Sequence, residues 1–182
     1  MRKLVLITLA IFVLTPFSYA IEKKVIDKSN SFGGVTVKTV YGSNDNEFKL
    51  SSKIEFLNGE GVVRQREGYR LLNQYNTLKI EKVIEDYASN GSLFRSEIII
   101  AEEKARELGY HKIVTFYSLD GNTTSKEVYY NDTELEKMVY TKSIEYYSVV
   151  GKKVKSVFFL TEENTEQTGY SKLISYLEND KM

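Results

Sequence analysis

Apolar side chains recur along this chain at intervals of thirty residues. That interval separates the aliphatic residues Ile54, Ile84, Val114, Ile144 and Ile174. Two positions after each of these the chain has Phe56, Asp86, Phe116, Tyr146 and Tyr176, and seven positions after the first four it has Gly61, Gly91, Gly121 and Gly151. A fixed period of this length is typical of repeat architectures, in which each unit is one small structural motif. The chain is therefore expected to be a tandem repeat protein.

Each unit has the pattern of a β-hairpin. Residues 114–119 alternate apolar and mixed side chains and are rich in β-branched and aromatic types, which favours a strand. Asp120-Gly121 then supplies residues suited to the positive backbone dihedrals of a tight turn, as Asn90-Gly91 does one unit earlier. A second apolar segment follows each turn, at residues 97–100, 127–130 and 157–160. We expect it to be the returning strand of the hairpin.

A short polar segment connects one hairpin to the next. Residues 101–109 are good helix formers with a glycine where the helix should end. Residues 132–138 are a similar segment, and Asn131 is placed to cap it. Residues 162–168 are almost wholly polar, and this copy is compatible with either a turn or a helix. The expected unit is strand, turn, strand and short helix.

The predicted fold class is mainly β with a minor α component, in which the units join their hairpins into one continuous antiparallel sheet. A single repeat domain is expected over residues 21–182, with a partial unit at about 24–53, full units at 54–83, 84–113, 114–143 and 144–173, and a cap at 174–182. The partial unit rests on Phe32-Gly33 and Val40-Tyr41, whose spacing matches later units but lies two residues out of phase. Glu178, Asp180 and Lys181 are expected to protect the last strand from edge-to-edge pairing. The pattern leaves open whether the sheet is flat, closed or covered by a partner chain.

The first 20 residues have the three parts of a secretory signal peptide. Arg2-Lys3 is followed by an apolar run from Leu4 to Leu14 and by the small-x-small sequence Ser18-Tyr19-Ala20. We expect cleavage before Ile21 and a periplasmic or secreted protein without a membrane span. The chain has no cysteine that could carry a lipoprotein anchor.

Composition excludes several kinds of chemistry. With no cysteine and one histidine, the chain has no thiolate metal site, thiol nucleophile or disulfide. Without Arg2 and Lys3 of the signal, 23 basic residues remain against 25 acidic ones, and this balance does not suggest nucleic-acid binding. His111 lacks neighbouring ligands in the sequence and is expected to be an exposed residue near a strand start. No catalytic, cofactor-binding or metal-ligating residue is predicted.

Three glutamates also follow the period. Glu67, Glu97 and Glu127 are thirty residues apart on the returning strands. We expect them to lie on a solvated face and to pair with Lys or Arg across strands, rather than to bind calcium, which needs six to eight converging oxygens.

Among the features of the composition, the tyrosines suggest a function most directly. On the first strand of each unit, the Ile54/Phe56 side reads as an apolar core stripe, and the opposite side is amphipathic and rich in tyrosine. A row of tyrosines offers rigid contact area with a polar group, which suits the binding of protein or glycan. The candidate binding face comprises Tyr87, Tyr117, Tyr147, Glu85 and Glu145.

The combination of apolar-x-aromatic strands, glycine turns and terminal Gly-Tyr pairs resembles that of exported bacterial tandem β-hairpin repeat proteins. The resemblance implies no catalytic residues. We therefore expect a non-enzymatic exported protein that binds another protein or a second copy of itself through an extended sheet surface. The alternatives are a cell-wall or carbohydrate binder, or a hydrolase that uses paired carboxylates such as Asp45 and Glu47 or Glu102 and Glu103.

Overall fold

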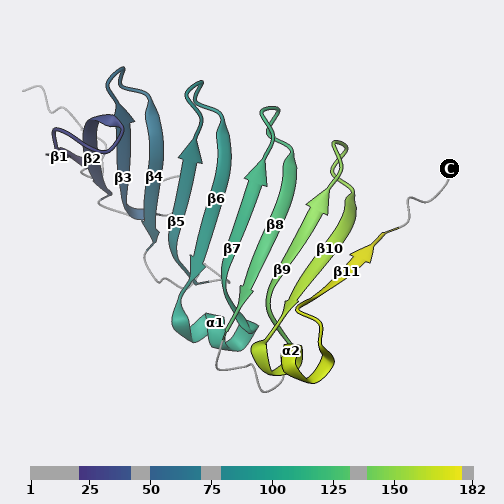
Figure 1. The fold of residues 1–182 in the computed structure, drawn as a ribbon. Coiled ribbons are helices and arrows are strands. Elements are labelled where there is room, and N and C mark those ends of the chain that lie inside the picture. The colour runs from purple at the N-terminus through teal and green to yellow at the C-terminus, as the bar shows by residue number, and fades with distance from the viewer. Residues whose placement is uncertain (1–20, 42–49, 71–78, 132–138, 178–182) are drawn as a thin grey trace, which may run out of the picture.

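A computed structural model describes residues 21–41, 50–70, 79–131 and 139–177. Within these ranges eleven strands form one antiparallel sheet in which each strand pairs with its neighbours in the sequence (Figure 1). The strands are β1 (Ile21–Asp27), β2 (Gly33–Tyr41), β3 (Leu50–Asn58), β4 (Val63–Arg70), β5 (Ile80–Tyr87), β6 (Leu93–Ile100), β7 (Tyr110–Tyr117), β8 (Thr123–Tyr130), β9 (Tyr140–Tyr147), β10 (Lys153–Leu160) and β11 (Lys172–Tyr176). The helices are α1 (Glu102–Leu108) and α2 (Glu162–Thr168). The predicted fold class is confirmed, and the sheet is open.

All five hairpins among the described residues turn through the same kind of loop. In the β5–β6 hairpin, Ala88 N donates to Ser92 O at 2.9 Å and Gly91 N donates to Ala88 O at 2.9 Å. This is a three-residue loop whose last residue is left-handed and forms a bulge. That residue is a glycine in every copy, with φ between 77° and 83°: Gly33, Gly61, Gly91, Gly121 and Gly151. The predicted turns at Asn90-Gly91 and Asp120-Gly121 are confirmed, although only the glycine has a positive φ.

The first hairpin explains the partial unit that lies out of phase. Gly33 occupies the same left-handed position between β1 and β2 as Gly61 does between β3 and β4. The two glycines are 28 residues apart rather than thirty, which corresponds to the offset of two residues in the sequence.

The two helices lie at the end of the sheet opposite the tight turns (Figure 1). As predicted, α1 ends at Gly109, which is left-handed and donates its N–H to Ala105 O. Residues 162–168 form a helix rather than a turn because the Thr161 side chain caps its start and the left-handed Gly169 ends it. The helix predicted at residues 132–138 lies outside the described residues, as do Glu178, Asp180 and Lys181.

The strand register shows that the expected division into a core face and a wet face is wrong. Residues directly opposite each other in the ladder share a face, and the pairs across β3 to β9 place Glu67, Glu97 and Glu127 between the repeating aliphatic residues. The resulting row is Ile54, Glu67, Ile84, Glu97, Val114, Glu127, Ile144. We call this side the glutamate face, and the side that carries Tyr87, Tyr117 and Tyr147 the tyrosine face.

The sheet buries its side chains mainly against adjacent strands, and among the described residues no large side chain is completely buried. The main contacts join neighbouring strands, and α1 packs on β7. Buried apolar residues are therefore divided between the glutamate face, with Val114, Ile144 and Val157, and the tyrosine face, with Val37, Ile100 and Leu160.

Candidate functional site

The structure brings the predicted tyrosine row together on one face. Tyr87, Tyr117 and Tyr147 end the alternate strands β5, β7 and β9, next to the tight turns. Alternate strands in a sheet are about 10 Å apart, so the row spans roughly 20 Å. All three side chains are half-buried. Glu85 and Glu145 lie on the same face, two residues before Tyr87 and Tyr147.

A hydrogen bond within each strand joins tyrosine to glutamate at two of these positions. The Tyr87 hydroxyl donates to Glu85 Oε2 at 2.9 Å, and the Tyr147 hydroxyl donates to Glu145 Oε2 at 2.6 Å. Burial and the neighbouring carboxylate raise the pKa of Tyr147 to about 12 and that of Tyr87 still higher. Burial opposes ionisation of Glu145, but hydrogen bonds from Tyr147 and Lys153 outweigh it and lower its pKa. Tyr87 and Tyr147 therefore stay protonated, and Glu145 stays ionised, around neutral pH.

Tyr117 differs from the other two because Thr115 stands where they have glutamate. Its hydroxyl lies 3.1 Å from Ser96 Oγ on the adjacent strand. The tyrosine row is therefore regular in position but not in its polar partners.

Arg66 is a member of this site that the sequence analysis missed. Its Nε lies 3.2 Å from Glu55 Oε1, and its Nη1 lies 3.2 Å from Glu85 Oε2. Nη1 also donates to the Tyr87 hydroxyl at 2.8 Å, and the guanidinium carbon lies 5.3 Å from the Tyr87 ring centre. Arg66 opposes Glu55 and Glu85 in the ladder, a pairing that becomes visible only when the register is known.

An apolar stripe crosses the middle of the tyrosine face. Val83, Ile98, Ile113 and Val128 follow one another in register across β5 to β8, and all four are half-buried. Among the described residues, no second layer of strands packs over the stripe. The sequence carried a signal for it, because Val83 and Ile113 each precede a repeating aliphatic residue and Ile98 and Val128 are also thirty residues apart.

The recurring glutamates of the other face form ion pairs with lysines that recur at the same interval. The carboxylates of Glu67, Glu97 and Glu127 lie 3.0, 4.0 and 2.8 Å from the ammonium groups of Lys82, Lys112 and Lys142, respectively. The predicted pairing across strands is confirmed. These carboxylates are not freely solvated, however, because the three side chains are only 19%, 13% and 16% exposed.

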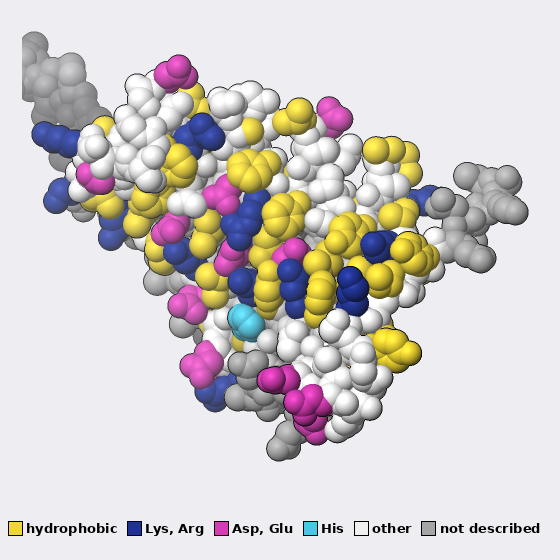
Figure 2. Space-filling view, in the orientation of Figure 1, with side chains coloured by type: hydrophobic (Ala, Val, Ile, Leu, Met, Phe, Trp, Pro, Cys, Tyr) yellow, Lys and Arg dark blue, Asp and Glu magenta, His cyan; other side chains and the backbone are white. Residues whose placement is uncertain are grey.

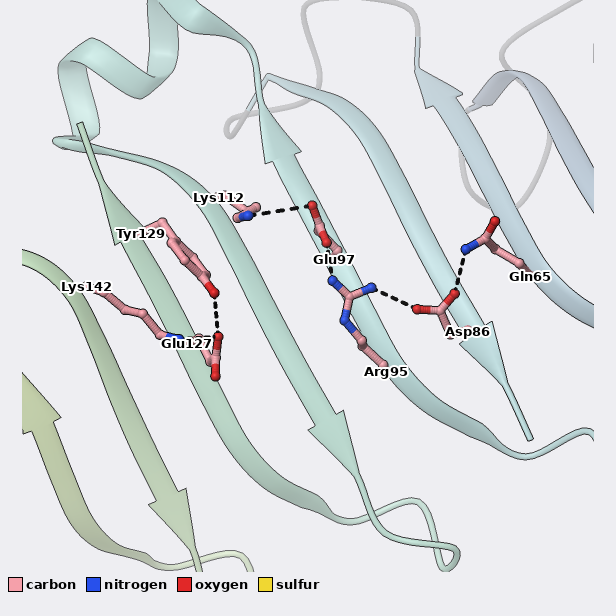
Figure 3. A network of polar contacts seen from close by, with 8 residues as sticks. All are labelled: Gln65, Asp86, Arg95, Glu97, Lys112, Glu127, Tyr129 and Lys142. Atoms are coloured by element: carbon pink, nitrogen blue, oxygen red, sulfur yellow. Dashed lines mark hydrogen bonds and ion pairs between the residues drawn. The ribbon is translucent and has the colours of Figure 1, made fainter. Parts of the chain in front are cut away.

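Tyrosines complete two of these pairs. The Tyr69 hydroxyl donates to Glu67 at 2.8 Å, and the Tyr129 hydroxyl donates to Glu127 at 2.6 Å, as Figure 3 shows for the second pair. Lys112 and Lys142 lie 4.1 and 4.9 Å from the Tyr129 ring centre, within the range of cation–π attraction. Hydrophobic and basic side chains accordingly alternate in a band across this face (Figure 2).

Asp86 stands at a repeat position that is aromatic in the other units, and its carboxylate has polar partners on the neighbouring strands. Arg95 Nη1 lies 2.8 Å from Asp86 Oδ2, and Gln65 Nε2 donates to Asp86 Oδ1 at 2.8 Å (Figure 3). Arg95 also forms an ion pair with Glu97. Arg95 and Gln65 oppose Asp86 on the two neighbouring strands, and this exception to the repeat is therefore stabilised locally.

His111 is exposed, as expected, at an irregularity in β7. It borders a cavity of about 460 Å³ beside α1, together with Glu81 and Glu102. Glu102 and Glu103 form ion pairs with Arg106 and Lys79. Within the described ranges, no three side chains of the metal-ligating types are grouped to hold an ion. Asp45 and Glu47 lie outside the described residues.

Comparison of the chain with known protein families finds no matching family, and comparison with curated proteins finds no similar sequence. None of the helices that the structure describes has the length and apolar character needed to cross a membrane.

Proposed function

We propose that the protein is exported and non-enzymatic, and that it binds another protein through the tyrosine face. The observation that supports this most strongly is the stripe of Val83, Ile98, Ile113 and Val128 on a face without a second layer among the described residues. A sheet with an apolar face is normally covered by another layer. The tyrosine row lies on the same face, separated from the stripe by the polar row of Glu85, Ser96, Thr115, Lys126 and Glu145, and it adds rigid contact area with polar groups.

The geometry favours a protein over a glycan as the partner. Sugar binding uses aromatic rings with free faces, whereas Arg66 lies over the Tyr87 ring and the hydroxyls of Tyr87 and Tyr147 are bound to glutamates. An apolar stripe with a polar border is the usual arrangement of a protein interface. A carbohydrate or cell-wall ligand is the second candidate, because the tyrosine row is also long enough to follow an extended chain.

A carboxylate-based hydrolase is a weaker proposal. A general acid needs a carboxyl group whose pKa is raised. Glu127 and Glu145 instead have lowered pKa values, because hydrogen bonds from Lys142 and Tyr129, and from Tyr147 and Lys153, outweigh the effect of burial.

The proposed location rests on the first 20 residues and on the resemblance to exported hairpin repeat proteins. Expression of the full chain in a bacterial host tests it directly. We expect the protein in the periplasm or the medium, with Ile21 as its first residue. A chain retained in the cytoplasm that still begins at Met1 would be inconsistent with export.

The binding proposal is tested by photo-crosslinking in the native compartment. A benzoylphenylalanine residue at position 113 would lie on the tyrosine face, and one at position 112 would lie on the opposite face of the same strand. We expect a crosslinked partner from position 113 and none from position 112. Equal crosslinking from both positions, or from 112 alone, would show that the tyrosine face is not the binding surface.

Matched tyrosine variants separate binding from folding. Tyr87→Ala/Tyr117→Ala/Tyr147→Ala removes the row, and Tyr69→Ala/Tyr129→Ala removes tyrosines with the same hydrogen bond to glutamate on the other face. We expect the first variant alone to lose the crosslinked partner while both retain the circular dichroism spectrum of the native sheet. Retention by both variants would assign the row to sheet packing. Recovery of peptidoglycan or another glycan in place of a protein would favour the second candidate.

A further inference from the structure

Within the part of the chain that the structure describes, the last strand, β11, leaves one edge of the sheet open. Among the described strands it pairs only with β10, whereas β2 to β10 each have two neighbours. Its side chains are exposed on both faces: Leu173 and Ile174 are 44% exposed and Tyr176 is 72% exposed. Ile144, thirty residues before Ile174, is 9% exposed because strands flank it on both sides. Ile174 is more exposed than Ile144 because no described strand lies on the outer side of β11.

The hydrogen bonds to β10 show which residues of β11 direct their backbone groups outward. Leu160 N donates to Ser171 O at 3.0 Å, and Leu177 N donates to Val154 O at 3.0 Å. In an antiparallel ladder the residues bonded to one neighbour alternate with those facing the other side. Ser171, Leu173, Ser175 and Leu177 therefore face β10, and the backbone groups of Lys172, Ile174 and Tyr176 face the open edge.

Within the described residues, the two edge strands of the sheet differ in how many charged residues they contain. The seven residues of β1 include four charged ones, of which Lys24 and Asp27 are exposed, beside Val25 and Ile26, which are 49% and 48% exposed. Among the five residues of β11, Lys172 is the only charged one. Charged side chains on an edge strand discourage pairing with other strands, and apolar ones favour it. Both strands expose aliphatic side chains, and the smaller share of charged residues in β11 favours contact through this edge.

We propose that two copies of the chain pair β11 with β11 in antiparallel orientation, so that the sheet continues across a two-fold axis at Ile174. This interaction goes beyond the proposed function, since it uses the sheet edge and leaves the tyrosine face free. In this register Ile174 opposes Ile174 of the second copy, and Lys172 opposes Tyr176. All three are outward-facing residues, and they would exchange about six backbone hydrogen bonds across the new ladder.

The side-chain pairs in this register are those that the sheet already uses. The row Ile144, Val157, Ile174 continues into Ile174 of the second copy. A lysine opposite an aromatic residue occurs between Lys155 and both Tyr146 and Tyr176, with the ammonium 5.1 and 5.7 Å from the two ring centres. The new pair of Lys172 and Tyr176 repeats this contact on the same face. A second copy is therefore a better match for this edge than a strand without such a pattern.

Single-cysteine variants test the register, because the natural chain has no cysteine. In the proposed dimer the two Cα atoms of residue 174 are about 5.5 Å apart, within the range that a disulfide can join. Those of residue 175 are diagonal neighbours, about 7 to 8 Å apart and beyond this range. With protein from expression of the full chain, we expect a covalent dimer from Ile174→Cys under mild oxidation and little from Ser175→Cys. Equal crosslinking, or none at position 174, would overturn the register.

Charge variants test the interface itself. Ile174→Lys and Ile174→Glu each place like charges opposite one another, and we expect the dimer dissociation constant in analytical ultracentrifugation to rise at least about tenfold for each variant alone. An equimolar mixture should recover a dimer because the opposed charges then attract. A monomeric wild-type protein, or a dimer unaffected by both variants, would overturn the proposal. Tyr87→Ala/Tyr117→Ala/Tyr147→Ala should remain dimeric, so failure of this proposal is distinguishable from failure of the binding proposal.

Discussion

Replacing Glu127 by glutamine tests whether the recurring glutamates stabilise the sheet. The carboxylate accepts a hydrogen bond from the Tyr129 hydroxyl at 2.6 Å and lies 2.8 Å from the Lys142 ammonium. A hydrogen bond to a charged group contributes about 1.5 to 3 kcal/mol and a neutral one about 1 kcal/mol, so the loss of charge should cost about 1 kcal/mol. The partly exposed ion pair adds about 0.5 kcal/mol. We expect Glu127→Gln to lower the free energy of unfolding by about 1 to 2 kcal/mol.

The matched control is Glu102→Gln, which removes the same charge from an exposed position. The Glu102 side chain is 80% exposed and pairs with Arg106 along α1. Such helical pairs contribute about 0.3 to 0.5 kcal/mol, so the control should be nearly as stable as the wild type. For a domain of this size 1 kcal/mol corresponds to about 2 to 4 °C in Tm. Glu127→Gln should therefore melt several degrees below Glu102→Gln.

The dependence on pH adds a second criterion. Burial disfavours the charged form of Glu127, but Lys142 and Tyr129 outweigh burial, and the pKa in the folded protein is lower than usual. The stabilisation is therefore present above the ordinary glutamate pKa of about 4.3 and is lost as the pH falls through the lowered value. We expect the gap between wild type and Glu127→Gln to close in acid. Equal Tm values for Glu127→Gln and Glu102→Gln at pH 7 would refute this account, as would a difference between wild type and Glu127→Gln that persists in acid. Either result would favour a ligand-binding role for the glutamates.

Three further changes test the turns, a helix cap and the tyrosines. Gly121→Ala should lower the free energy of unfolding in urea by about 1 to 2 kcal/mol, because the φ of Gly121 is 80°. An added Cβ has free space there, so the loss would come from the backbone conformation and not from a clash. The control Gly59→Ala, at a position without positive φ, should cost less. Thr161→Ala removes the side chain that accepts from Asn164 N, so the amide exchange of Asn164 should accelerate, and Thr161→Ser should restore protection. Because the pKa of Tyr147 is raised, the stabilisation by this residue is complete below pH 10 and is lost as the pH rises toward 12. In urea titrations, Tyr147→Phe should therefore lose less stability than the wild type between pH 9 and pH 11. Equal losses would contradict the assignment.

The features that the sequence could predict are those set by neighbouring residues. Gly91 and Gly121 mark tight turns because a left-handed residue is needed there, and helix formers followed by Gly109 define α1. The period then places each hairpin beside the next, which leads to the continuous sheet. Residues 162–168 remained ambiguous because α2 has no buried residue, and its cap at Thr161 is the clearest local signal.

The register could not be predicted in the same way, and it decides the chemistry of both faces. Each glycine turn contains a bulge, and the pairing shifts by one residue close to it, as between Phe116 and Tyr117. A shift of one residue exchanges the two faces of a strand. Glu127 rather than Lys126 therefore opposes Val114, and Val128 opposes Ile113.

The tyrosine row shows how the same shift affects the candidate site. The spacing of Tyr87, Tyr117 and Tyr147 places them on one face, because their strands are equivalent members of the repeat. The spacing does not reveal what lies beside them. The bulge in each hairpin puts the glutamates of the returning strands on the opposite face and places Ile98 and Val128 on the same face as the tyrosines. A row that by itself is compatible with packing thus shares its face with an apolar stripe, and the proposed binding role of this face rests on that stripe.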